Sequence, residues 1–344
     1  MKKLLLTVAL ITVVCVGCFA GKPHVVMFYN LENLFDTIND PDKNDEEFLP
    51  DGERKWNTYK YYAKLANIER VLWDIAGQHK EFPAIIGVSE IENRTVLEDL
   101  IAQEKLSKGN YRIVHYDSPD KRGVDCAFFY RPDVFKIEGS KAEPYNHPTR
   151  KNFYTRDLVT MWGTIEGEPF FFLVSHWPSR LGGKEQSSPL REHAALRCKQ
   201  IADSVRRINP ATKVVIMGDL NDDATDKSIV EVLGAKGKIK QVPENGFFNP
   251  FIDMLKAGYG TLAYGDAWNL FDNIIVSDNL ATGSTGELKI QKGESAKFYG
   301  NIFSRPYMFQ KEGQYKGYPL RTFIGTNFQN GYSDHLPVYI YISK

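Results

Sequence analysis

Short apolar segments alternate along this chain with segments in which apolar residues recur every three or four positions. The short runs are rich in β-branched and aromatic residues, which predicts strands, at residues 24–29, 83–88, 111–116, 125–130, 158–165, 170–175, 213–217, 271–276 and 338–342. The longer spacing predicts helices, at residues 58–76, 94–104 and 189–208. The strands on either side of Glu166-Gly167-Glu168 are expected to pair as a hairpin. Strands that alternate with helices but include hairpins predict an α/β fold with mixed sheets.

The beginning of the chain breaks this alternation. A positively charged start precedes an apolar run, Leu4 to Val16, that is too short to span a bilayer as a mature helix. We therefore expect a signal peptide at residues 1–20 and a single domain over residues 21–344, with no transmembrane helix in the mature protein. Two processing sites stay open. Lipidation of Cys18 would give a periplasmic or cell-surface lipoprotein tethered to the membrane, and cleavage after Ala20 would give a secreted protein.

The composition is that of an ordinary globular protein, with 42% hydrophobic and 25% charged residues among 344. Lys+Arg and Asp+Glu both number 43, so the formal net charge is zero. This balance argues against a protein that binds nucleic acid through a large basic field, although it permits a local basic groove. We expect a monomer.

Two features outside the regular pattern leave alternatives open. Cys126 and Cys198 are the cysteines beyond the leader, and a disulfide between them and two buried thiols are equally compatible with the sequence. Residues 278–331 are rich in Gly, Lys, Tyr and Phe without a clear period, which predicts a long loop system over one face. Because such loops are uncommon without a role, covering a substrate groove is one interpretation.

Polar side chains lie at the ends of several predicted strands. They occur in Tyr29-Asn30-Leu31-Glu32-Asn33, Val88-Ser89-Glu90-Ile91-Glu92, Val174-Ser175-His176-Trp177, Met217-Gly218-Asp219-Leu220-Asn221 and Ser333-Asp334-His335-Leu336-Pro337. A sheet protein assembles an active site from distant segments at such strand ends. Carboxylate and amide oxygens with two histidines are typical of a divalent-metal hydrolase rather than a thiolate zinc site.

The residue types at these ends indicate individual roles. Asn30 and Glu32 are two positions apart on a strand, so they are predicted to share one face. Glu90 ends a buried apolar strand, where an unpaired carboxylate is costly, so it needs a cation or several donors. Asp219 and Asn221 are also predicted to share a face. The carboxylate could orient or deprotonate a water, and the amide could donate to a phosphoryl oxygen without adding negative charge.

Arginines near His176 change the interpretation of that histidine. Arg180 and Arg191 follow it in the sequence, and a pair of cations around a histidine indicates an anion site. We therefore predict that Arg180 and Arg191 bind the substrate phosphate. Arg150 and Arg156 are interpreted as solvated surface residues.

An acid inside an apolar run usually has a specific partner, and Asp272 is such an acid. We expect it to accept a hydrogen bond from one nitrogen of His335. This bond would fix the histidine tautomer and favour its protonated form.

Taken in order, these stretches resemble the endonuclease/exonuclease/phosphatase superfamily of metal-dependent phosphoesterases, over about residues 25–342. The elements that carry the resemblance are Asn30, Glu90, the Gly-Asp-x-Asn of residues 218–221 and the terminal Ser333-Asp334-His335. The resemblance implies a four-layer α/β/β/α sandwich with the site at one end. It also implies Mg²⁺ or Mn²⁺ as the cofactor, held by Glu90 and Asp334 with Asn30 close to it.

The same resemblance implies the catalytic roles. Asp219 would orient or activate the attacking water, and Asn221 would bind the phosphate. His335, held by Asp272, would face the phosphoryl group, and His176 resembles the second histidine of the deoxyribonuclease branch.

Three functions remain open at this point. The first is an exported, divalent-metal-dependent phosphodiesterase with nucleic acid as its substrate, that is, a nuclease. The second is a phosphatase or phospholipase-C-like hydrolase of phospholipid headgroups or phosphorylated sugars, whose site the aromatic stretch 298–323 could line. The third, a non-catalytic surface binding protein, is disfavoured because a binder would not need the intact set of polar residues.

Overall fold

The structure is a computed structural model that describes residues 22–150, 152–293 and 296–344. The predicted leader, with Cys18, lies outside the described residues. The helices are α1 (Thr58–His79), α2 (Arg94–Ile101), α3 (Lys184–Ile208), α4 (Phe251–Lys256) and α5 (Asp278–Thr282). Short 3-10 or π turns are η1 (Glu46–Phe48), η2 (Leu106–Gly109), η3 (Ser228–Val232), η4 (Ile239–Gln241) and η5 (Pro306–Met308). No helix within the described residues is long and apolar enough to cross a membrane.

Asparagine side chains begin the first two helices. The Asn57 side chain accepts a hydrogen bond from the backbone N–H of Lys60, and that of Asn93 accepts one from Val96. These bonds satisfy backbone donors that the first helical turn leaves without a partner. Helix α1 ends at Lys80, whose left-handed conformation stops the helical ladder.

The first sheet contains both the beginning and the end of the described chain. Its strands are β1 (His24–Leu34), β2 (Ile85–Ile91), β3 (Arg112–His115), β4 (Asp125–Tyr130), β14 (Lys289–Gln291), β15 (Gly300–Ile302) and β18 (Val338–Ser343). They are ordered β14-β18-β1-β2-β4-β3, and β15 also pairs with β18. Only the β1–β2 pair is parallel among these described strands, so the sheet is mixed, as predicted.

The second sheet is also mixed. Its strands are β5 (Phe135–Glu143), β6 (Leu158–Ile165), β7 (Glu168–His176), β8 (Lys213–Asp219), β9 (Ala235–Lys236), β10 (Phe247–Phe248) and β13 (Asp272–Ser277). They are ordered β5-β6-β7-β8-β13-β10-β9, with β7–β8 and β9–β10 parallel. The predicted hairpin at Glu166 is the β6–β7 pair. Two separate small hairpins are β11 (Leu262–Tyr264) with β12 (Ala267–Asn269), and β16 (Phe323–Ile324) with β17 (Asn327–Phe328).

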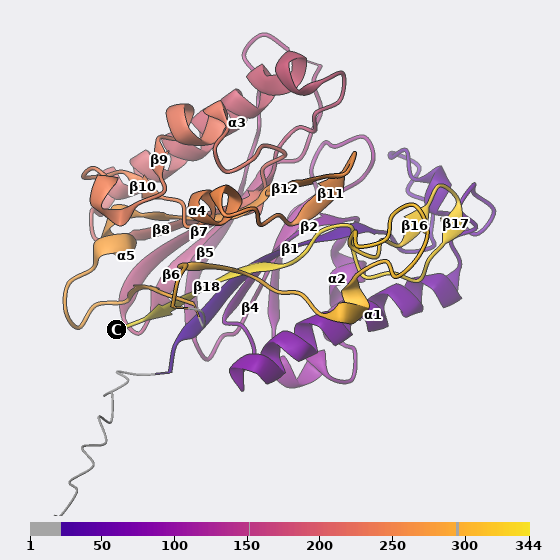
Figure 1. The fold of residues 1–344 in the computed structure, drawn as a ribbon, viewed down its shortest axis with the longest axis horizontal. Coiled ribbons are helices and arrows are strands. Elements are labelled where there is room, and N and C mark those ends of the chain that lie inside the picture. Colours follow the sequence, from indigo (N-terminus) through magenta and orange to yellow (C-terminus); the bar gives the residue numbers. More distant parts are fainter. Residues whose placement is uncertain (1–21, 151, 294–295) are drawn as a thin grey trace, which may run out of the picture.

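The two sheets pack face to face with helices on the outer faces (Figure 1). Alternate residues of β1 show this directly, because Val26 and Phe28 join the core between the sheets. Met27 and Tyr29 join the core under α1 and α2. Both faces of the strand are therefore buried, which explains its continuous apolar run. At Gly87 the sheets approach so closely that a Cβ would lie 2.5 Å from the Met217 sulfur.

Helix α3 covers the outer face of the second sheet and completes the fourth layer (Figure 1). Its residues Ala194, Ala195 and Cys198 pack with Leu173 and Ile216 of the sheet. The fold is thus the α/β/β/α sandwich that the resemblance implied.

The prediction of a loop system over residues 278–331 is wrong in part. This stretch contains α5 and two strands, β14 and β15, that pair with β18 at the edge of the first sheet. The strands are only three residues long each, so periodicity could not reveal them. Cys126 and Cys198 are both buried and free, so the structure has two thiols in place of a disulfide.

Candidate active site

The predicted polar strand ends meet at one edge of the sandwich. The parallel strands β7 and β8 end together, with His176 in register with Asp219. The antiparallel strand β13 begins at the same edge, where Asp272 is in register with Asp219. In the other sheet, Asn30 and Glu90 occupy the ends of the parallel strands β1 and β2. Because parallel strands end on the same side of a sheet, residues distant in sequence converge here.

A single amide joins the two sheets at this edge. The Asn30 side-chain NH₂ donates to the Asp219 carboxylate at 3.0 Å and to the Glu90 carboxylate at 3.3 Å. The Nε2 atom of His176 lies 3.5 Å from Asp219 and 3.9 Å from Glu90. One ligand atom each of Glu90, His176 and Asp219 lie within 4.8 Å of one another. The structure therefore brings four predicted site residues into one cluster.

This cluster fits a divalent cation. Among the described residues, no Lys or Arg forms an ion pair with Glu90 or Asp219, although both carboxylates face the same space. Two carboxylates this close need a positive partner, because each disfavours the charge on the other. Carboxylate oxygens are the ligands that Mg²⁺ and Mn²⁺ prefer, and an imidazole nitrogen is available as well.

Two hydrogen-bond donors orient the buried Asp219 carboxylate. Its second oxygen accepts a hydrogen bond from the backbone N–H of Asn221 at 3.0 Å. Burial raises the pKa of Asp219 to about 6, and the neighbouring Asp272 and Glu90 carboxylates add to the rise against the lowering effect of His335. A carboxylate with such a pKa is a better proton acceptor at neutral pH than an ordinary aspartate.

His335 and Asp272 form the predicted pair. The Nδ1 atom of His335 lies 2.8 Å from Asp272, and its Nε2 atom lies 3.7 Å from Asp219. Burial alone would lower the pKa of His335, but Asp272 and Asp219 outweigh burial and raise this pKa well above its ordinary value. His335 is therefore an imidazolium at neutral pH, with a donor turned toward the cluster.

The second histidine, His176, has a lowered pKa where His335 has a raised one. Burial lowers the pKa of His176 well below its ordinary value, and the positive charges of Arg156 and Arg122 lower it further. Its Nδ1 atom is buried and has no hydrogen-bond partner in the described part of the chain. His176 is therefore neutral, so its Nε2 lone pair can serve as a ligand or as a proton acceptor.

Asp334 lies outside the cluster of Glu90, His176 and Asp219. Its carboxylate forms an ion pair with Arg321, which lies 3.7 Å from Glu32. Burial raises the pKa of Asp334, yet His335 and Arg321 outweigh burial and lower it. The residue lies beside His335 in the sequence and faces the same cavity. Its predicted role as a metal ligand stays a prediction.

A buried network behind Asp334 was not found from the sequence. Glu32 accepts hydrogen bonds from the backbone N–H and the hydroxyl of Thr322, at 2.7 and 2.8 Å. Lys64 of α1 is fully buried and donates to the same hydroxyl at 2.5 Å. Burial and the charge of Asp334 raise the pKa of Glu32 to about 7. A lysine inside the apolar stripe of α1 was the one signal for this network.

Glu32 and Asn30 do not share a face, contrary to the prediction. Glu32 has a positive φ of 48°, which breaks the alternation of side chains along β1. Glu90 and Asn221 also have positive φ angles, of 58° and 49°. Non-glycine residues in this conformation are strained, and such strain is common at functional sites.

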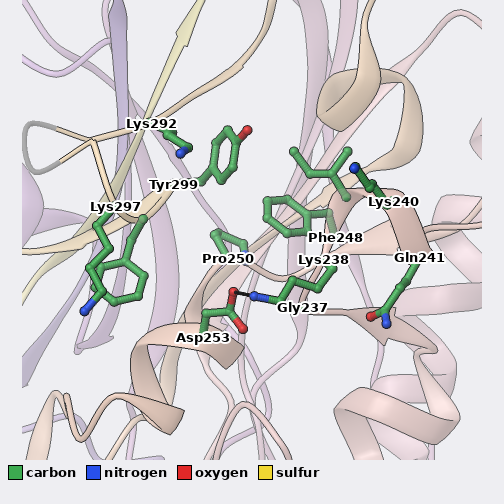
Figure 2. Close-up of a pocket in the computed structure, with 12 residues that line it drawn as sticks. Gly237, Lys238, Lys240, Gln241, Phe248, Pro250, Asp253, Lys292, Lys297 and Tyr299 are labelled. Atoms are coloured by element: carbon green, nitrogen blue, oxygen red, sulfur yellow. Dashed lines mark hydrogen bonds and ion pairs between the residues drawn. The ribbon is translucent and has the colours of Figure 1, made fainter.

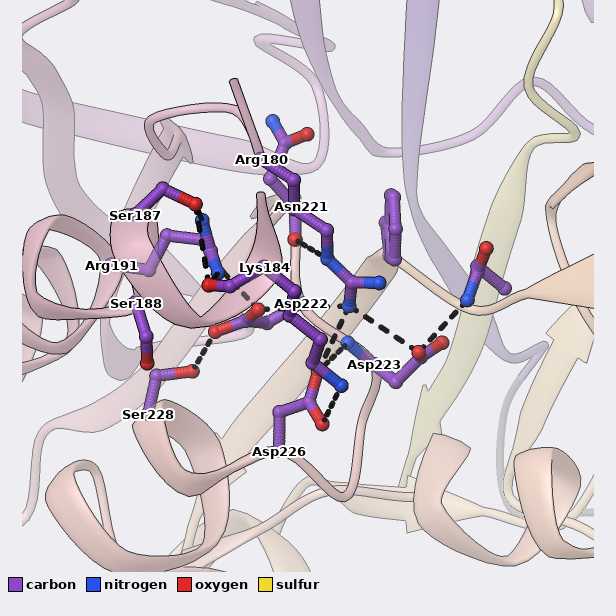
Figure 3. A network of polar contacts seen from close by, with 12 residues as sticks. Arg180, Lys184, Ser187, Ser188, Arg191, Asn221, Asp222, Asp223, Asp226 and Ser228 are labelled. Atoms are coloured by element: carbon purple, nitrogen blue, oxygen red, sulfur yellow. Dashed lines mark hydrogen bonds and ion pairs between the residues drawn. The ribbon is translucent and has the colours of Figure 1, made fainter. Parts of the chain in front are cut away.

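The guanidinium groups of Arg180 and Arg191 have aspartate partners, and phosphate binding by these two residues stays a prediction. Arg191 is fully buried and forms an ion pair with Asp222 at 2.6 Å. Arg180 contacts Asp223 and Asp226 at 3.3 and 2.9 Å, as Figure 3 shows. Both guanidinium groups neutralise aspartates that follow β8, because that loop folds back onto the start of α3. The sequence did not reveal the pairing since the two segments are about forty residues apart.

Asn221 lies at the edge of the cluster. Its side-chain NH₂ donates to the Trp177 carbonyl at 3.0 Å, and it is partly exposed. Phosphate binding by this amide stays a prediction. Gly218 lies tightly against the neighbouring strand. A Cβ at this position would lie 1.8 Å from the Ser175 carbonyl oxygen.

Arg156 is a further residue that the sequence analysis misplaced, since it is buried rather than solvated. It donates to the Trp177 carbonyl at 2.8 Å and pairs with Asp120 at 3.1 Å. It therefore supports the residue next to His176. It also lines a cavity of about 430 Å³ with three other cations, Lys121, Arg122 and Arg150.

Two further cavities differ in their relation to the site. One of about 530 Å³ is lined by Asp334 and His335. Another, of about 490 Å³, is lined by four lysines with Phe248 and Tyr299 (Figure 2), and it contains no predicted site residue. The chemistry at the strand ends is thus accessible from the first of these cavities and not from the second.

Comparison with known proteins agrees with this geometry. Residues 25–344 match the model of the Endonuclease/Exonuclease/phosphatase family. A solved structure of TDP2 from D. rerio, complexed with single strand DNA product, is 13% identical with a TM-score of 0.55, covering 94% of this chain and 100% of that chain. A search of curated proteins finds no match.

Two Bacteroides thetaiotaomicron structures have the same fold. An endonuclease/exonuclease/phosphatase family protein is 17% identical with a TM-score of 0.55, covering 93% of this chain and 94% of that chain. A mannosyl-6-phosphatase is 16% identical with a TM-score of 0.52, covering 93% and 99%. At these identities the likeness shows the fold, and the match over residues 25–344 shows the family. The chain belongs to the endonuclease/exonuclease/phosphatase family and is a phosphoesterase of that superfamily.

Proposed function

We propose that this phosphoesterase is an exported enzyme that requires Mg²⁺ or Mn²⁺ and hydrolyses a P–O ester bond by in-line attack of a water, with nucleic acid as its substrate. Glu90 and His176 would hold the cation, with Asn30 and Asp219 beside them. When bound, the cation would polarise a phosphoryl oxygen and neutralise developing charge. Export, through the leader and lipidation of Cys18 or cleavage after Ala20, is part of the same proposal.

The residues of the chain divide the proton transfers between them. Asp219 is buried, has a raised pKa and is oriented by two donors, so it can orient the water and accept its proton. His335 is held protonated by Asp272, so it can donate a hydrogen bond to a phosphoryl oxygen or a proton to the leaving oxygen. A base and an acid therefore stand on two sides of one small space.

The observation that carries the proposal is the approach of His335 Nε2 to within 3.7 Å of Asp219, beside a carboxylate cluster that has no Lys or Arg partner among the described residues. A structural ion pair would not leave Glu90 and Asp219 without a Lys or Arg in the described part of the chain. An arrangement of base, acid and cation site around one space is what phosphoryl hydrolysis needs.

The cavity that contains Arg156 favours nucleic acid as the substrate. It is lined by Lys121, Arg122, Arg150 and Arg156, and the last of these holds the residue next to His176. Neighbouring phosphates of a strand could lie there while one phosphate occupies the reaction site. Because strand binding releases counterions, activity on nucleic acid would fall steeply with salt.

A second candidate is a phosphatase or phospholipase-C-like hydrolase of small esters, such as phosphorylated sugars or lipid headgroups. The cavity of about 530 Å³ at Asp334 and His335 supports it, since that volume encloses one drug-sized ligand. The similar mannosyl-6-phosphatase shares the fold.

The test is cleavage of plasmid and of single-stranded DNA by protein lacking residues 1–20, in Mg²⁺ and after removal of the metal with EDTA. We expect cleavage that EDTA abolishes and Mg²⁺ or Mn²⁺ restores, and none by His335→Ala. Cleavage unaffected by EDTA or by His335→Ala would contradict the proposed mechanism. A folded protein that hydrolyses only phosphorylated sugars or lipids would establish the second candidate.

A further inference from the structure

The cavity beside His335 is built from segments that the catalytic chemistry does not need. Its walls are the β11–β12 hairpin and the segment 310–324, and its floor includes Asp334 and His335. Backbone pairing of Leu262 with His335 attaches the hairpin directly to the catalytic histidine. The cavity therefore opens onto the position where a scissile phosphate would lie.

Side-chain contacts fix the two walls against each other. The Tyr318 hydroxyl donates to the Asp266 carboxylate at 2.7 Å and accepts from the Asp266 backbone N–H at 2.6 Å. The rings of Trp268 and Phe309 meet at 6.4 Å between centroids. Two segments about fifty residues apart are thus held as one enclosure, so the cavity is preformed.

The lining has the chemistry of a ring-binding site. Three tyrosines line it, Tyr264, Tyr315 and Tyr318, and the last two rings lie 5.6 Å apart. Leu262, Pro319 and Ile324 add apolar surface, and Gln310 and Gln314 add carboxamides that can donate and accept. Tyr264 lines the cavity although it is 80% exposed, so its ring is accessible to a ligand.

The charges that line the cavity are balanced. Two carboxylates, Asp266 and Asp334, and two cationic side chains, Arg321 and His335, line it, and Arg321 is paired with Asp334. A second phosphate would find no excess of positive charge there, whereas a neutral ring with donor groups needs none. The cavity lined by Lys121, Arg122, Arg150 and Arg156 differs, because its four cations outnumber its one carboxylate, Asp120.

We propose that the cavity beside His335 binds one unpaired nucleobase of the substrate strand, which lies on the tyrosines while the neighbouring phosphate reacts. This inference rests on the proposed phosphoesterase function and deepens it. A volume of about 530 Å³ accommodates one base with its sugar. A base inside a duplex would first have to be unpaired and unstacked, which costs free energy. Stacking on aromatic rings accepts any base, since every base has a π-face. The enzyme therefore acts on single strands and strand ends in preference to the interior of a duplex.

The test compares three DNA substrates of equal length in Mg²⁺: a single strand, its duplex, and a strand whose residues are abasic. The abasic strand keeps the phosphates and loses the bases. We expect kcat/KM for the base-bearing single strand to exceed that for the abasic strand and the duplex by roughly 5- to 100-fold. Tyr264→Ala should reduce kcat/KM for the base-bearing strand toward the abasic value and leave the abasic value unchanged.

Control variants keep the result interpretable. Tyr315→Ala removes a second ring of the same cavity and should have the same selective effect. Tyr59→Ala removes a tyrosine on α1 that is 73% exposed and lines none of the cavities described above, so it should change nothing. A thermal melt of each variant shows that it is folded.

The possible outcomes distinguish failure of the nucleobase site from failure of the proposed phosphoesterase function. Equal rates on duplex and single strand, or equal losses on both strands in Tyr264→Ala and Tyr315→Ala, would overturn the nucleobase site and leave the phosphoesterase intact. Hydrolysis of a phosphorylated hexose but of no DNA strand would do the same. A folded, metal-supplied protein that hydrolyses no phosphoester would overturn the proposed function itself, and the inference with it.

Discussion

The carboxylate at the end of β8 and those in the loop that follows β8 are neutralised in opposite ways. Asp222, Asp223 and Asp226 receive the guanidinium groups of Arg180 and Arg191 (Figure 3). Asp219, only three residues before Asp222, and its partner Glu90 contact histidines and an amide instead.

The difference separates structural carboxylates from functional ones. The charge of a buried aspartate that has its own arginine is already neutralised in the folded protein. A pair of carboxylates without Lys or Arg keeps an electrostatic demand that an external cation can meet. Residue type alone did not distinguish the groups, because Asp219 and Asp222 are three residues apart in one polar stretch and no arginine lies beside either of them in the sequence.

The largest expected effect is on catalysis. Asp219→Asn keeps the shape of the side chain but removes the proton acceptor, so kcat should fall by about 10²–10⁴-fold. The free energy of unfolding of the metal-free protein should not fall, because burial disfavours the lost charge. Steady-state kinetics with urea unfolding would measure both. Near-normal kcat in this variant would remove Asp219 from the mechanism.

The next largest effect is a loss of stability, expected when an ion pair of the group Asp222, Asp223 and Asp226 is broken. Arg191→Ala leaves the Asp222 carboxylate buried without its partner, so the free energy of unfolding should fall by about 3–5 kcal/mol. Because Arg191 is fully buried, KM of the remaining folded enzyme should stay close to wild type. Restoration of stability by Arg191→Met with Asp222→Leu would support the ion-pair explanation. A large rise in KM without loss of stability would support the phosphate-binding role.

Metal binding should change the stability by a smaller amount, and this change tests the cluster of Glu90, His176 and Asp219 independently of any activity measurement. Mg²⁺ at a hundred times its dissociation constant should stabilise the wild type by about 3 kcal/mol. Glu90→Gln should lose most of this gain in a thermal melt. Asp226→Asn is the matched control, since Asp226 already has Arg180 and Lys184, and it should respond to Mg²⁺ as the wild type does. Equal loss in both variants would show that the ion binds nonspecifically.

The smallest expected effect is on the pH dependence of the free energy of unfolding, through Glu92. Glu92 accepts a hydrogen bond from the Asp36 backbone, but burial, followed by the charges of Asp36, Asp45 and Asp40, raises its pKa to about 8. Since its pKa is higher in the folded state than the ordinary 4.5, the folded state holds the proton more tightly. The stability it contributes is complete below pH 4.5 and is lost as pH rises toward 8.

The substitution Glu92→Gln isolates this contribution, because the amide is neutral at every pH and keeps the acceptor oxygen. We expect wild type to lose about 2 kcal/mol relative to Glu92→Gln between pH 6 and pH 8. Urea unfolding at the two pH values measures the difference. Parallel pH dependence of the two proteins would show that Glu92 is ionised throughout.

Much of the fold followed from the sequence, since apolar runs and helical stripes are local patterns. Helix α1 was predicted from the spacing of its apolar residues, and β1 from six consecutive strand-forming residues. The short strands β14 and β15 were missed because three residues are too few to show a period. The edge strand β5 was missed because most of its residues are not fully buried and its sequence is polar.

The sequence by itself determined the family and which residue types occur at the strand ends. Asn30, Glu90, His176, Asp219 and the Asp272–His335 pair could be named in advance because strand ends and buried acids are visible in a one-dimensional pattern. Only the tertiary structure decided which charges neutralise which. It assigned Arg180 and Arg191 to aspartates, Arg321 to Asp334, and left Glu90 and Asp219 without Lys or Arg among the described residues. Electrostatic partners are set by distances of a few ångströms between segments far apart in the chain, and no local pattern contains that information.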